Sequence, residues 1–321
     1  MLTALYGPQA TLAVTLKMAT IAPEGSNWMQ VIREGAEEVK EKTKGRVKFK
    51  FYPGGVMGNY LSVLKKIRIG QLHGGAFVAG DLAHIYPDVQ IYSLPFLFDS
   101  YEDVDYVRSR MDQTIIDGLE QHGFVAAGIS EGGFVYPMSD KPVRGPADLS
   151  GRKVWLPEGD VFGETIFKAA GIAPVSLPIS DVYTGLQTGL IDSLGSTPAG
   201  AIAFQWHTRM KYLTDSAMMY LLALFVVDKN SFAGLTPADQ QVVRDVIGEK
   251  FSLLDEINRR DNEQAKAALV KQGIEIIELS DDELGAWKDV AEKSIARLRA
   301  RGAFTEQAYE TVRSYLDAAA Q

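Results

Sequence analysis

The feature that most restricts the fold of this 321-residue chain is a segment of more than thirty residues without a strong helix breaker, between Thr236 and Gly273. It begins with Thr236-Pro237-Ala238-Asp239, in which a capping residue is followed by a first-turn proline and an early acid, as at the start of many helices. Gly248 is the one glycine inside it, and a helix tolerates such a residue. At about 1.5 Å per residue, a helix of this length exceeds the diameter of a small lobe. The segment therefore predicts one long helix, or two abutting helices, that spans two lobes.

Strand and helix patterns alternate through the rest of the chain. Apolar residues recur at every second position in residues 12–18, as in a strand, and at helical spacing after Ser26. Further strands are predicted at 47–51, 74–80, 123–130, 153–156, 174–177, 191–194 and 218–227, and further helices at 60–69, 102–122, 162–170, 181–190 and near 201–211. This alternation predicts an α/β fold with largely parallel sheets covered by helices on both faces.

The length of the chain fits two packed lobes. No low-complexity or Pro/Ser-rich linker separates them, so we expect strands and the long helix to join the lobes. The predicted boundaries are discontinuous. Lobe I comprises residues 1–138 and 226–262, and lobe II comprises residues 139–225 and 263–321.

Composition excludes several classes of protein. The net charge is −8 and no basic run is present, which argues against a nucleic-acid partner. There is no cysteine, and the four histidines lack metal-ligand spacing, so we expect neither a disulfide nor a metal site. The most hydrophobic stretch, residues 218–227, is about half as long as a membrane helix and predicts a buried strand.

The strongest indication of an enzyme is a G-x-S-x-G pattern around Ser130. In a nucleophile elbow, such a serine lies in a turn from a strand into a helix, with a histidine later in the chain. Residues 133–137 do not begin a helix, and His207 is the one later histidine. We therefore interpret the stretch around Ser130 as a glycine-rich crossing of the chain between the lobes. The alternative is a serine esterase that uses Ser130 and His207. The sequence predicts no other catalytic constellation, so we expect a protein that is not an enzyme.

Aromatic residues occur at many predicted element ends. Each alone would be a core residue, but several that converge would line a cleft, where α/β proteins commonly bind ligands. These residues are Trp28, Phe77, Phe96, Phe98, Phe134, Trp155, Tyr183 and Trp206.

Several blocks of the sequence resemble the solute-binding proteins of TRAP (tripartite ATP-independent periplasmic) transporters, of the DctP-like family. The blocks are IAPEGSNW, FYPGGVMGN, and residues 86–98, 141–157 and 171–192, and the resemblance extends from about Thr15 to the C-terminus. It implies a fold of the periplasmic-binding-protein type, with two α/β lobes, a ligand cleft between them, a long helix spanning both, and hinged closure on one small molecule. It also implies a TRAP membrane permease as partner, no cofactor, and a periplasmic location after removal of a signal segment, with or without a lipid anchor at the processed N-terminus.

The chain departs from the family pattern at the positions that bind carboxylates. Relatives typically carry an Arg in the motif G-x-K-x-R-x-P, and that position is Trp155 here. A second Arg is replaced in the stretch Gly132–Val135, the ligand-contacting Asn in residues 192–198 is lost, and the aromatic position before Ser-Glu-Val-Tyr is Ile179, whereas Asn27 is retained. A desolvated carboxylate needs a paired cation, and Trp offers one N–H and an apolar face.

We therefore predict an apolar or weakly polar ligand, with at most one polar end near Asn27, Ser196 or Thr197. In lacking this Arg, the chain also resembles a subset of these receptors that is linked to hydrophobic ligands and to a tetratricopeptide-repeat partner protein. A second hypothesis keeps an organic acid, bound by Lys153, Arg152 or Arg209. The predicted ligand-binding residues are Asn27, Trp28, Phe77, Val78, Phe134, Val135, Trp155, Ile179, Tyr183, Ser196, Thr197 and Trp206.

Overall fold

A computed structural model describes residues 13–319 of the chain. Its first lobe is built around a five-stranded sheet in the order β2-β1-β3-β9-β4. These strands are β1 (Val14–Thr20), β2 (Val47–Tyr52), β3 (Gly74–Val78), β4 (Phe124–Ser139) and β9 (Met219–Asp228). The helices that follow β1, β2 and the later elements of this lobe are α1 (Asn27–Lys42), α2 (Tyr60–Arg68), α3 (Tyr101–Gln121) and α7 (Lys229–Ala233). Leu12 of the predicted first strand lies outside the described residues.

The second lobe uses the far end of β4, which pairs with β7 (Ser193–Ser196) and β8 (Tyr212–Thr214), and β8 pairs with β10 (Glu275–Ile277). A separate parallel pair, β5 (Trp155–Pro157) and β6 (Val175–Leu177), is tied to β7 by a bridge between Val154 and Ser193. Helices α4 (Val161–Ala169), α5 (Val182–Thr188) and α6 (Pro198–Ala203) belong to this lobe. The two-lobed α/β class predicted from the sequence is confirmed. The boundaries of the lobes stay a prediction.

The expectation of largely parallel sheets is wrong. β1 with β2, β1 with β3, β5 with β6, and β8 with β10 are parallel, but β9 runs antiparallel to both β3 and β4, and β4 runs antiparallel to β7 and β8. The two longest strands, β4 and β9, carry the chain between the lobes in opposite directions. Because a strand buried on both faces is apolar in either pairing, the sequence pattern alone does not reveal its direction.

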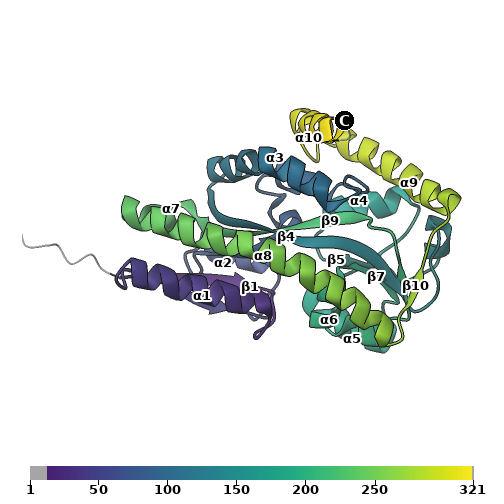
Figure 1. Cartoon of the computed structure of the whole chain (residues 1–321), viewed down its shortest axis with the longest axis horizontal. Coiled ribbons are helices and arrows are strands. Elements are labelled where there is room, and N and C mark those ends of the chain that lie inside the picture. The colour runs from purple at the N-terminus through teal and green to yellow at the C-terminus, as the bar shows by residue number, and fades with distance from the viewer. Residues whose placement is uncertain (1–12, 320–321) are drawn as a thin grey trace, which may run out of the picture.

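The long helix is confirmed as one continuous element, α8 (Pro237–Lys271), of 35 residues. The Thr236 hydroxyl caps it by accepting a hydrogen bond from the Asp239 N–H at 3.2 Å. A helix of this length spans about 50 Å. It contacts α1 in the first lobe, runs along β4, and reaches α6 in the second lobe (Figure 1).

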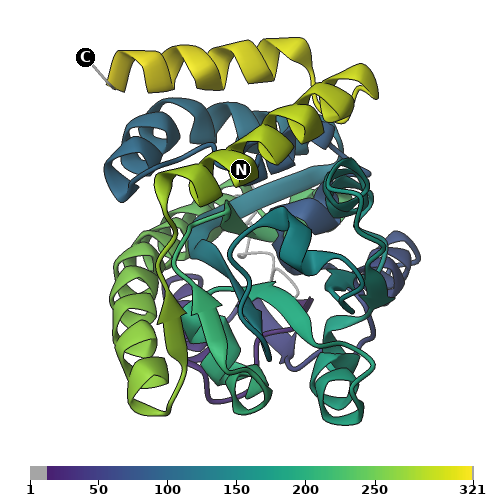
Figure 2. The ribbon, with the colours of Figure 1, turned by 90° about the vertical axis from the view of Figure 1, so that its right-hand side faces the viewer.

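The C-terminal helices also touch both lobes. α9 (Asp281–Ala300) packs against α4, and α10 (Glu306–Ala319) packs against α3. Figure 2 shows both helices in yellow beside the blue α3. The helix predicted near 201–211 is shorter than expected, because α6 ends at Ala203 and Gln205 adopts a positive φ of 58° before a 3-10 turn at Trp206–Arg209. Within residues 13–319, no helix combines the length and apolarity needed to cross a membrane.

A buried ionic network lies where β4 passes between the lobes. Glu131 on β4 is fully buried and accepts a hydrogen bond from Arg259 Nε at 2.9 Å and one from the Tyr220 hydroxyl at 3.1 Å. Asp255 on α8 accepts the Glu131 N–H at 2.7 Å and pairs with Arg108 of α3 at 2.9 Å. The network therefore joins α3, β4, β9 and α8 at one point.

Candidate ligand-binding site

A cavity of about 450 Å³ lies between the two lobes. The first lobe contributes the ends of β1 and β3, the start of α2 and the 3-10 helix at Ala79–Leu82. The second lobe contributes β5, β7 and the starts of α4 and α6. The lining is mostly aliphatic and aromatic, and a volume of this size suits a small organic ligand.

Most of the residues predicted for the site line this cavity. They are Phe77, Val78, Val135, Trp155, Ile179, Ser196, Thr197 and Trp206. Asn27, Trp28, Phe134 and Tyr183 do not line it. The ligand contacts themselves stay a prediction for all twelve residues.

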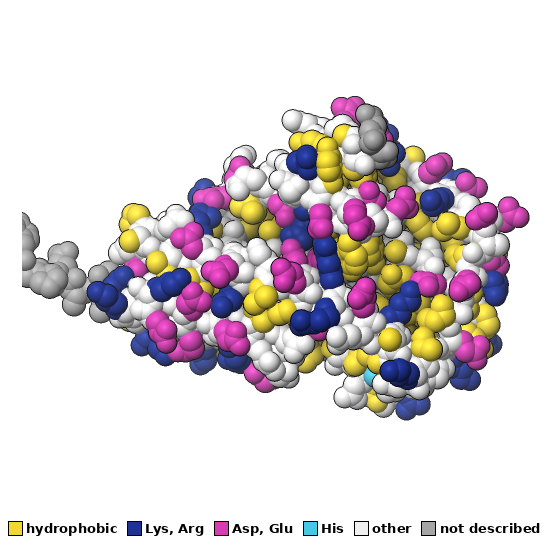
Figure 3. All heavy atoms as spheres, in the orientation of Figure 1, with side chains coloured by type: hydrophobic (Ala, Val, Ile, Leu, Met, Phe, Trp, Pro, Cys, Tyr) yellow, Lys and Arg dark blue, Asp and Glu magenta, His cyan; other side chains and the backbone are white. Residues whose placement is uncertain are grey.

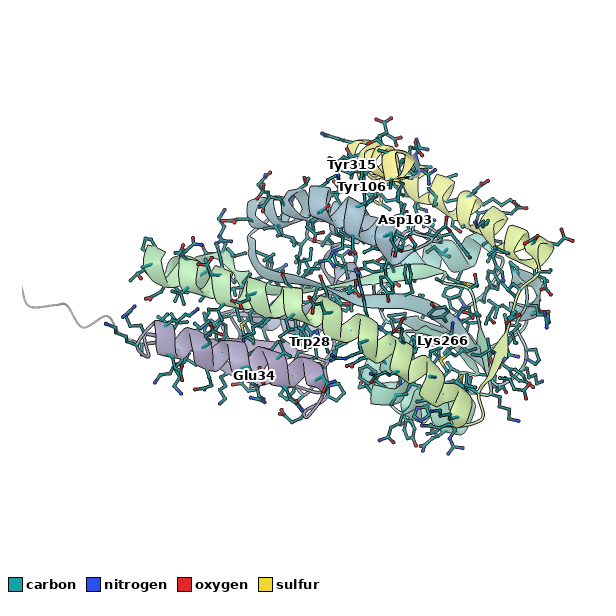
Figure 4. The ribbon with its side chains drawn as sticks, viewed as in Figure 1. Trp28, Glu34, Asp103, Tyr106, Lys266 and Tyr315 are labelled. Carbon is teal, nitrogen blue, oxygen red and sulfur yellow. The ribbon has the colours of Figure 1, made fainter. Side chains whose placement is uncertain are left out.

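Asn27 and Trp28 lie where α1 packs on α8 instead, and Figure 4 labels Trp28 between these two helices. Asn27 Nδ2 donates to the Asp261 carboxylate at 2.8 Å, and the Trp28 ring packs edge-on against Phe251 with centroids 5.6 Å apart. Their place in the block IAPEGSNW gave no indication that they face a neighbouring helix.

Phe134 and Tyr183 belong to the cores of the first and second lobes. Phe134 packs between Tyr101 and Tyr220, with ring centroids 4.8 and 5.6 Å away. Neighbouring strand residues point to opposite faces, so Val135 faces the cavity when Phe134 does not.

Trp155 lines the cavity and also belongs to the hydrophobic core of the second lobe. Its indole N–H donates to the Leu177 carbonyl at 2.9 Å, across the β5–β6 pair, and its ring packs edge-on against Trp206 at 5.2 Å. The side chain is 7% exposed. Because its one polar atom is already satisfied, Trp155 offers the cavity an apolar surface.

No Lys, Arg or His is found among the lining residues in the described part of the chain. The three cations considered for an organic acid are used elsewhere or exposed. Arg152 hydrogen-bonds to Asp140 and to the Ser193 hydroxyl, Lys153 Nζ donates to the Gly189 carbonyl at 2.7 Å, and Arg209 is exposed. None of the three lines the cavity.

The serine-esterase alternative finds no support in the local geometry. Ser130 lies inside β4, which continues to Ser139, so the turn from strand into helix that an elbow requires is not formed there. Its hydroxyl is buried and donates to the neighbouring Glu131 carbonyl, and His207 is bonded to the Ala201 carbonyl.

Four titratable side chains line the cavity, and no sequence motif marked any of them as a site residue. They are Tyr60, Asp81, Glu158 and Asp160. Burial raises the pKa of Asp81 to about 7 and also raises the pKa of Asp160, whose carboxylate caps α4 by accepting the Gly163 N–H at 2.8 Å. Burial raises the pKa of Tyr60 to about 12.

The two lobes touch across the mouth of this cavity. Asn59 Nδ2 donates to the Glu158 carboxylate, and the Tyr60 hydroxyl donates to the Gly159 carbonyl at 3.2 Å. Gly159 has a φ of +82°, and a Cβ there would lie 2.5 Å from the Tyr60 oxygen. A glycine is therefore needed at this contact, which closes the cleft beside the acidic residues.

The unpaired Asp81 has a consequence for stability. Its pKa is raised from 3.8 to about 7 in the folded protein, so the folded state holds a proton that the unfolded state releases between these values. The wild-type protein should therefore lose stability as the pH rises from about 4 to 7. An Asp81→Asn variant should avoid that loss and be more stable than the wild type by about 2 kcal/mol at pH 8, after allowance for solvent in the cavity.

This prediction is tested by urea unfolding of both ligand-free proteins at pH 5 and pH 8. The difference between them should be clearly smaller at pH 5. Equal stability at pH 8, or a variant less stable than the wild type, would show that Asp81 is already compensated.

Comparison with known proteins points in one direction. The model of the family described as "Bacterial extracellular solute-binding protein, family 7" matches residues 18–301. The C4-dicarboxylate-binding periplasmic protein of Rhodobacter capsulatus is 28% identical over 262 residues, covering 79% of this chain and 77% of the relative. The 2,3-diketo-L-gulonate-binding periplasmic protein of Escherichia coli is 26% identical over 244 residues, covering 74% and 73%.

Solved structures agree on the fold. The sugar acid binding protein of Advenella mimigardefordensis, in complex with galactonate, superposes with a TM-score of 0.88 at 19% identity, covering 96% of this chain and 99% of its own. At this identity the likeness concerns the fold alone.

Proposed function

Because this chain belongs to family 7 of the bacterial extracellular solute-binding proteins, we propose that it is the TRAP receptor for an apolar or weakly polar small molecule. In this proposal the protein performs no chemistry. It closes its two lobes around the ligand and delivers it to the membrane permease of a TRAP transporter. We place it in the periplasm, either free or lipid-anchored.

The observation that carries the choice of ligand is the cation-free lining of the cavity in residues 13–319. The named relatives bind a C4-dicarboxylate and 2,3-diketo-L-gulonate. A buried carboxylate without a paired cation costs several kcal/mol, so this cavity is a poor site for such ligands. Apolar burial at about 25 cal/mol per Å² can supply the affinity instead.

The surface is consistent with a receptor that does not bind nucleic acid. On the face shown in Figure 3, Lys and Arg side chains are interspersed with Asp and Glu, and no large patch of one sign is seen. A tetratricopeptide-repeat partner is part of the proposal by resemblance, and the permease remains the main partner.

Mass spectrometry of the compound that co-purifies with the protein tests the proposal. We expect a mainly apolar compound that is lost on unfolding and dialysis and rebinds to the refolded protein. Recovery of a dicarboxylate or a sugar acid with the same behaviour would contradict the apolar site and would favour the second hypothesis, in which Lys153, Arg152 or Arg209 moves to pair with an acid.

A further inference from the structure

Two carboxyl groups from opposite lobes line the same cavity. Asp81 comes from the first lobe, in the 3-10 helix that directly follows β3, and Asp160 comes from the second lobe, at the start of α4. Their chain neighbours meet there: the Tyr60 hydroxyl donates to the carbonyl of Gly159, next to Asp160, at 3.2 Å, and Gly80, next to Asp81, lines a second cavity together with Asp160. Burial, with smaller contributions from both carboxylates, raises the pKa of Tyr60. Tyr60, Asp81 and Asp160 thus gather near the contact that closes the cleft.

Asp81 has no partner that would explain its presence. It is half-buried in the wall of the cavity, burial raises its pKa, and the backbone N–H of Val78 is the group that lowers it. Within the described residues it forms no ion pair and no hydrogen bond with another side chain. An unpaired carboxylate in an apolar enclosure is costly to the folded protein, so a ligand group that pairs with it would recover that energy.

Two cations line a second cavity of about 230 Å³, which shares Gly80, Gln90, Asp160 and Phe162 with the first. Its lining includes His84 and Arg301, and both are exposed. Arg301 Nη1 donates to the Thr165 hydroxyl at 3.0 Å. Neither cation lines the main cavity with Asp81, so they do not neutralise it from inside.

We propose that the ligand is an amine with an apolar body, and that its protonated nitrogen lies between Asp81 and Asp160 beside the ring of Tyr60. This inference rests on the proposed receptor function and specifies the polar end of the ligand. An ammonium group offers three hydrogen-bond donors, enough for both carboxylates and one further acceptor. Aromatic rings stabilise a cation that contacts their faces, and Tyr60 and Phe162 both line this part of the cavity.

The arrangement also links binding to closure. When the lobes close without a cation, two carboxylates from opposite lobes are brought together in a region of low dielectric, which opposes closure. An ammonium group between them removes that opposition and adds attraction in the closed form only. A ligand with this group therefore stabilises the closed state, as is required of a receptor whose closed form indicates that a ligand is bound.

The test uses three probes of equal chain length, octylamine, octanol and octanoate, titrated calorimetrically into the ligand-free full chain at pH 8. Octylamine is expected to bind at least about tenfold more tightly than octanol, since hydrogen bonds between charged groups are stronger than those to a neutral hydroxyl, and octanoate is expected to bind most weakly. In the Asp81→Asn variant the preference for octylamine over octanol should fall by about tenfold. An Asp117→Asn variant, which removes an exposed acid on α3, is the matched control and should keep the wild-type preference.

The pH dependence of octylamine binding provides a second test. Octylamine stays protonated below pH 9, so its affinity for the wild type should fall as the pH drops from 8 to 6, because Asp81 then takes up a proton that must be released on binding. Tyr60, Glu158 and Asp160 line the same cavity, and His84 and Arg301 line the second cavity beside Asp160. An Asp160→Asn variant separates the contribution of Asp160 to the pH dependence from that of Asp81.

The outcomes are distinct. Equal binding of all three probes would overturn the amine inference and leave the apolar receptor standing. Tightest binding of octanoate would overturn both. Binding of none of the three would overturn the amine inference, and the co-purified compound would then decide the receptor proposal separately.

Discussion

Replacing Arg108 by alanine is expected to lower the free energy of unfolding by about 3 kcal/mol, because it removes a buried cation from two partly buried carboxylates. Arg108 is 8% exposed, and it pairs with Asp112 at 3.0 Å and with Asp255 at 2.9 Å. It also donates to the Tyr220 hydroxyl. Burial raises the pKa of Asp112, and the charge of Arg108 and the hydrogen bond from Tyr92 counteract this effect. Urea unfolding followed by circular dichroism at pH 7 measures the loss.

An Arg110→Ala variant is the matched control. Arg110 lies on the same helix, is exposed, and contacts Tyr106 through its carbonyl and its ring. Its removal should change the free energy of unfolding by no more than about 0.5 kcal/mol. If the two variants lose similar stability, the network around Arg108 is not a buried, compensated set of charges.

The position of this network matters for the receptor. It joins α3 to β4, β9 and α8, and the last three carry the chain between the lobes. β4 is irregular on both sides of Glu131, with register shifts at Ala126/Gly128 and Glu131/Gly133. Because charged groups in a satisfied network hold a fixed geometry, we expect lobe motion to occur in the flanking backbone rather than at Glu131.

The sequence predicts much of this fold because local signals agree with the tertiary structure. The capping group at Thr236 and the absence of breakers before Gly273 define α8 without any information about packing. The apolar alternation in β1 and β2 does the same for the first lobe. β9 is antiparallel to β3 and β4 because the chain returns along it from the second lobe to the first. The residues of β9 themselves do not indicate this direction.

The site was predictable where the position in a strand determines which face a residue occupies. Trp155 and Val135 line the cavity for this reason, whereas Phe134 next to Val135 lies on the opposite face of β4. Asp81 and Asp160 are far apart in the sequence and on different lobes, so the tertiary arrangement of the lobes brings them into one cavity. Neither residue carries a motif, although Asp160 has the helix-capping pattern that also explains its position.

The second large effect is expected from Trp155→Arg. By the family resemblance, carboxylate-binding relatives carry an arginine at this position. Trp155 is 7% exposed, so a ligand can cover only about 20 Å² of its ring, and the loss of this surface alone costs about 0.5 kcal/mol of binding energy. The larger cost comes from the new guanidinium, which an apolar ligand would desolvate without pairing, so affinity for the co-purified apolar ligand should fall by more than about tenfold. The new guanidinium can still donate to the Leu177 carbonyl that now accepts the Trp155 N–H, so the β5–β6 pair keeps its bond. Calorimetric titration of wild type, Trp155→Arg and Trp155→Phe with the same extracted ligand measures the effect.

The Trp155→Phe variant separates the loss of apolar surface from the addition of charge. Phenylalanine keeps an aromatic face towards Trp206 but cannot bond to Leu177, so its affinity should fall less than tenfold. Trp155→Arg should in addition begin to bind a simple monocarboxylate such as octanoate, since a cation then lines the cavity beside the apolar wall. Unchanged affinity of Trp155→Arg for the extracted ligand would mean that Trp155 fills the core of the second lobe and that the specificity of the cavity is determined by other residues.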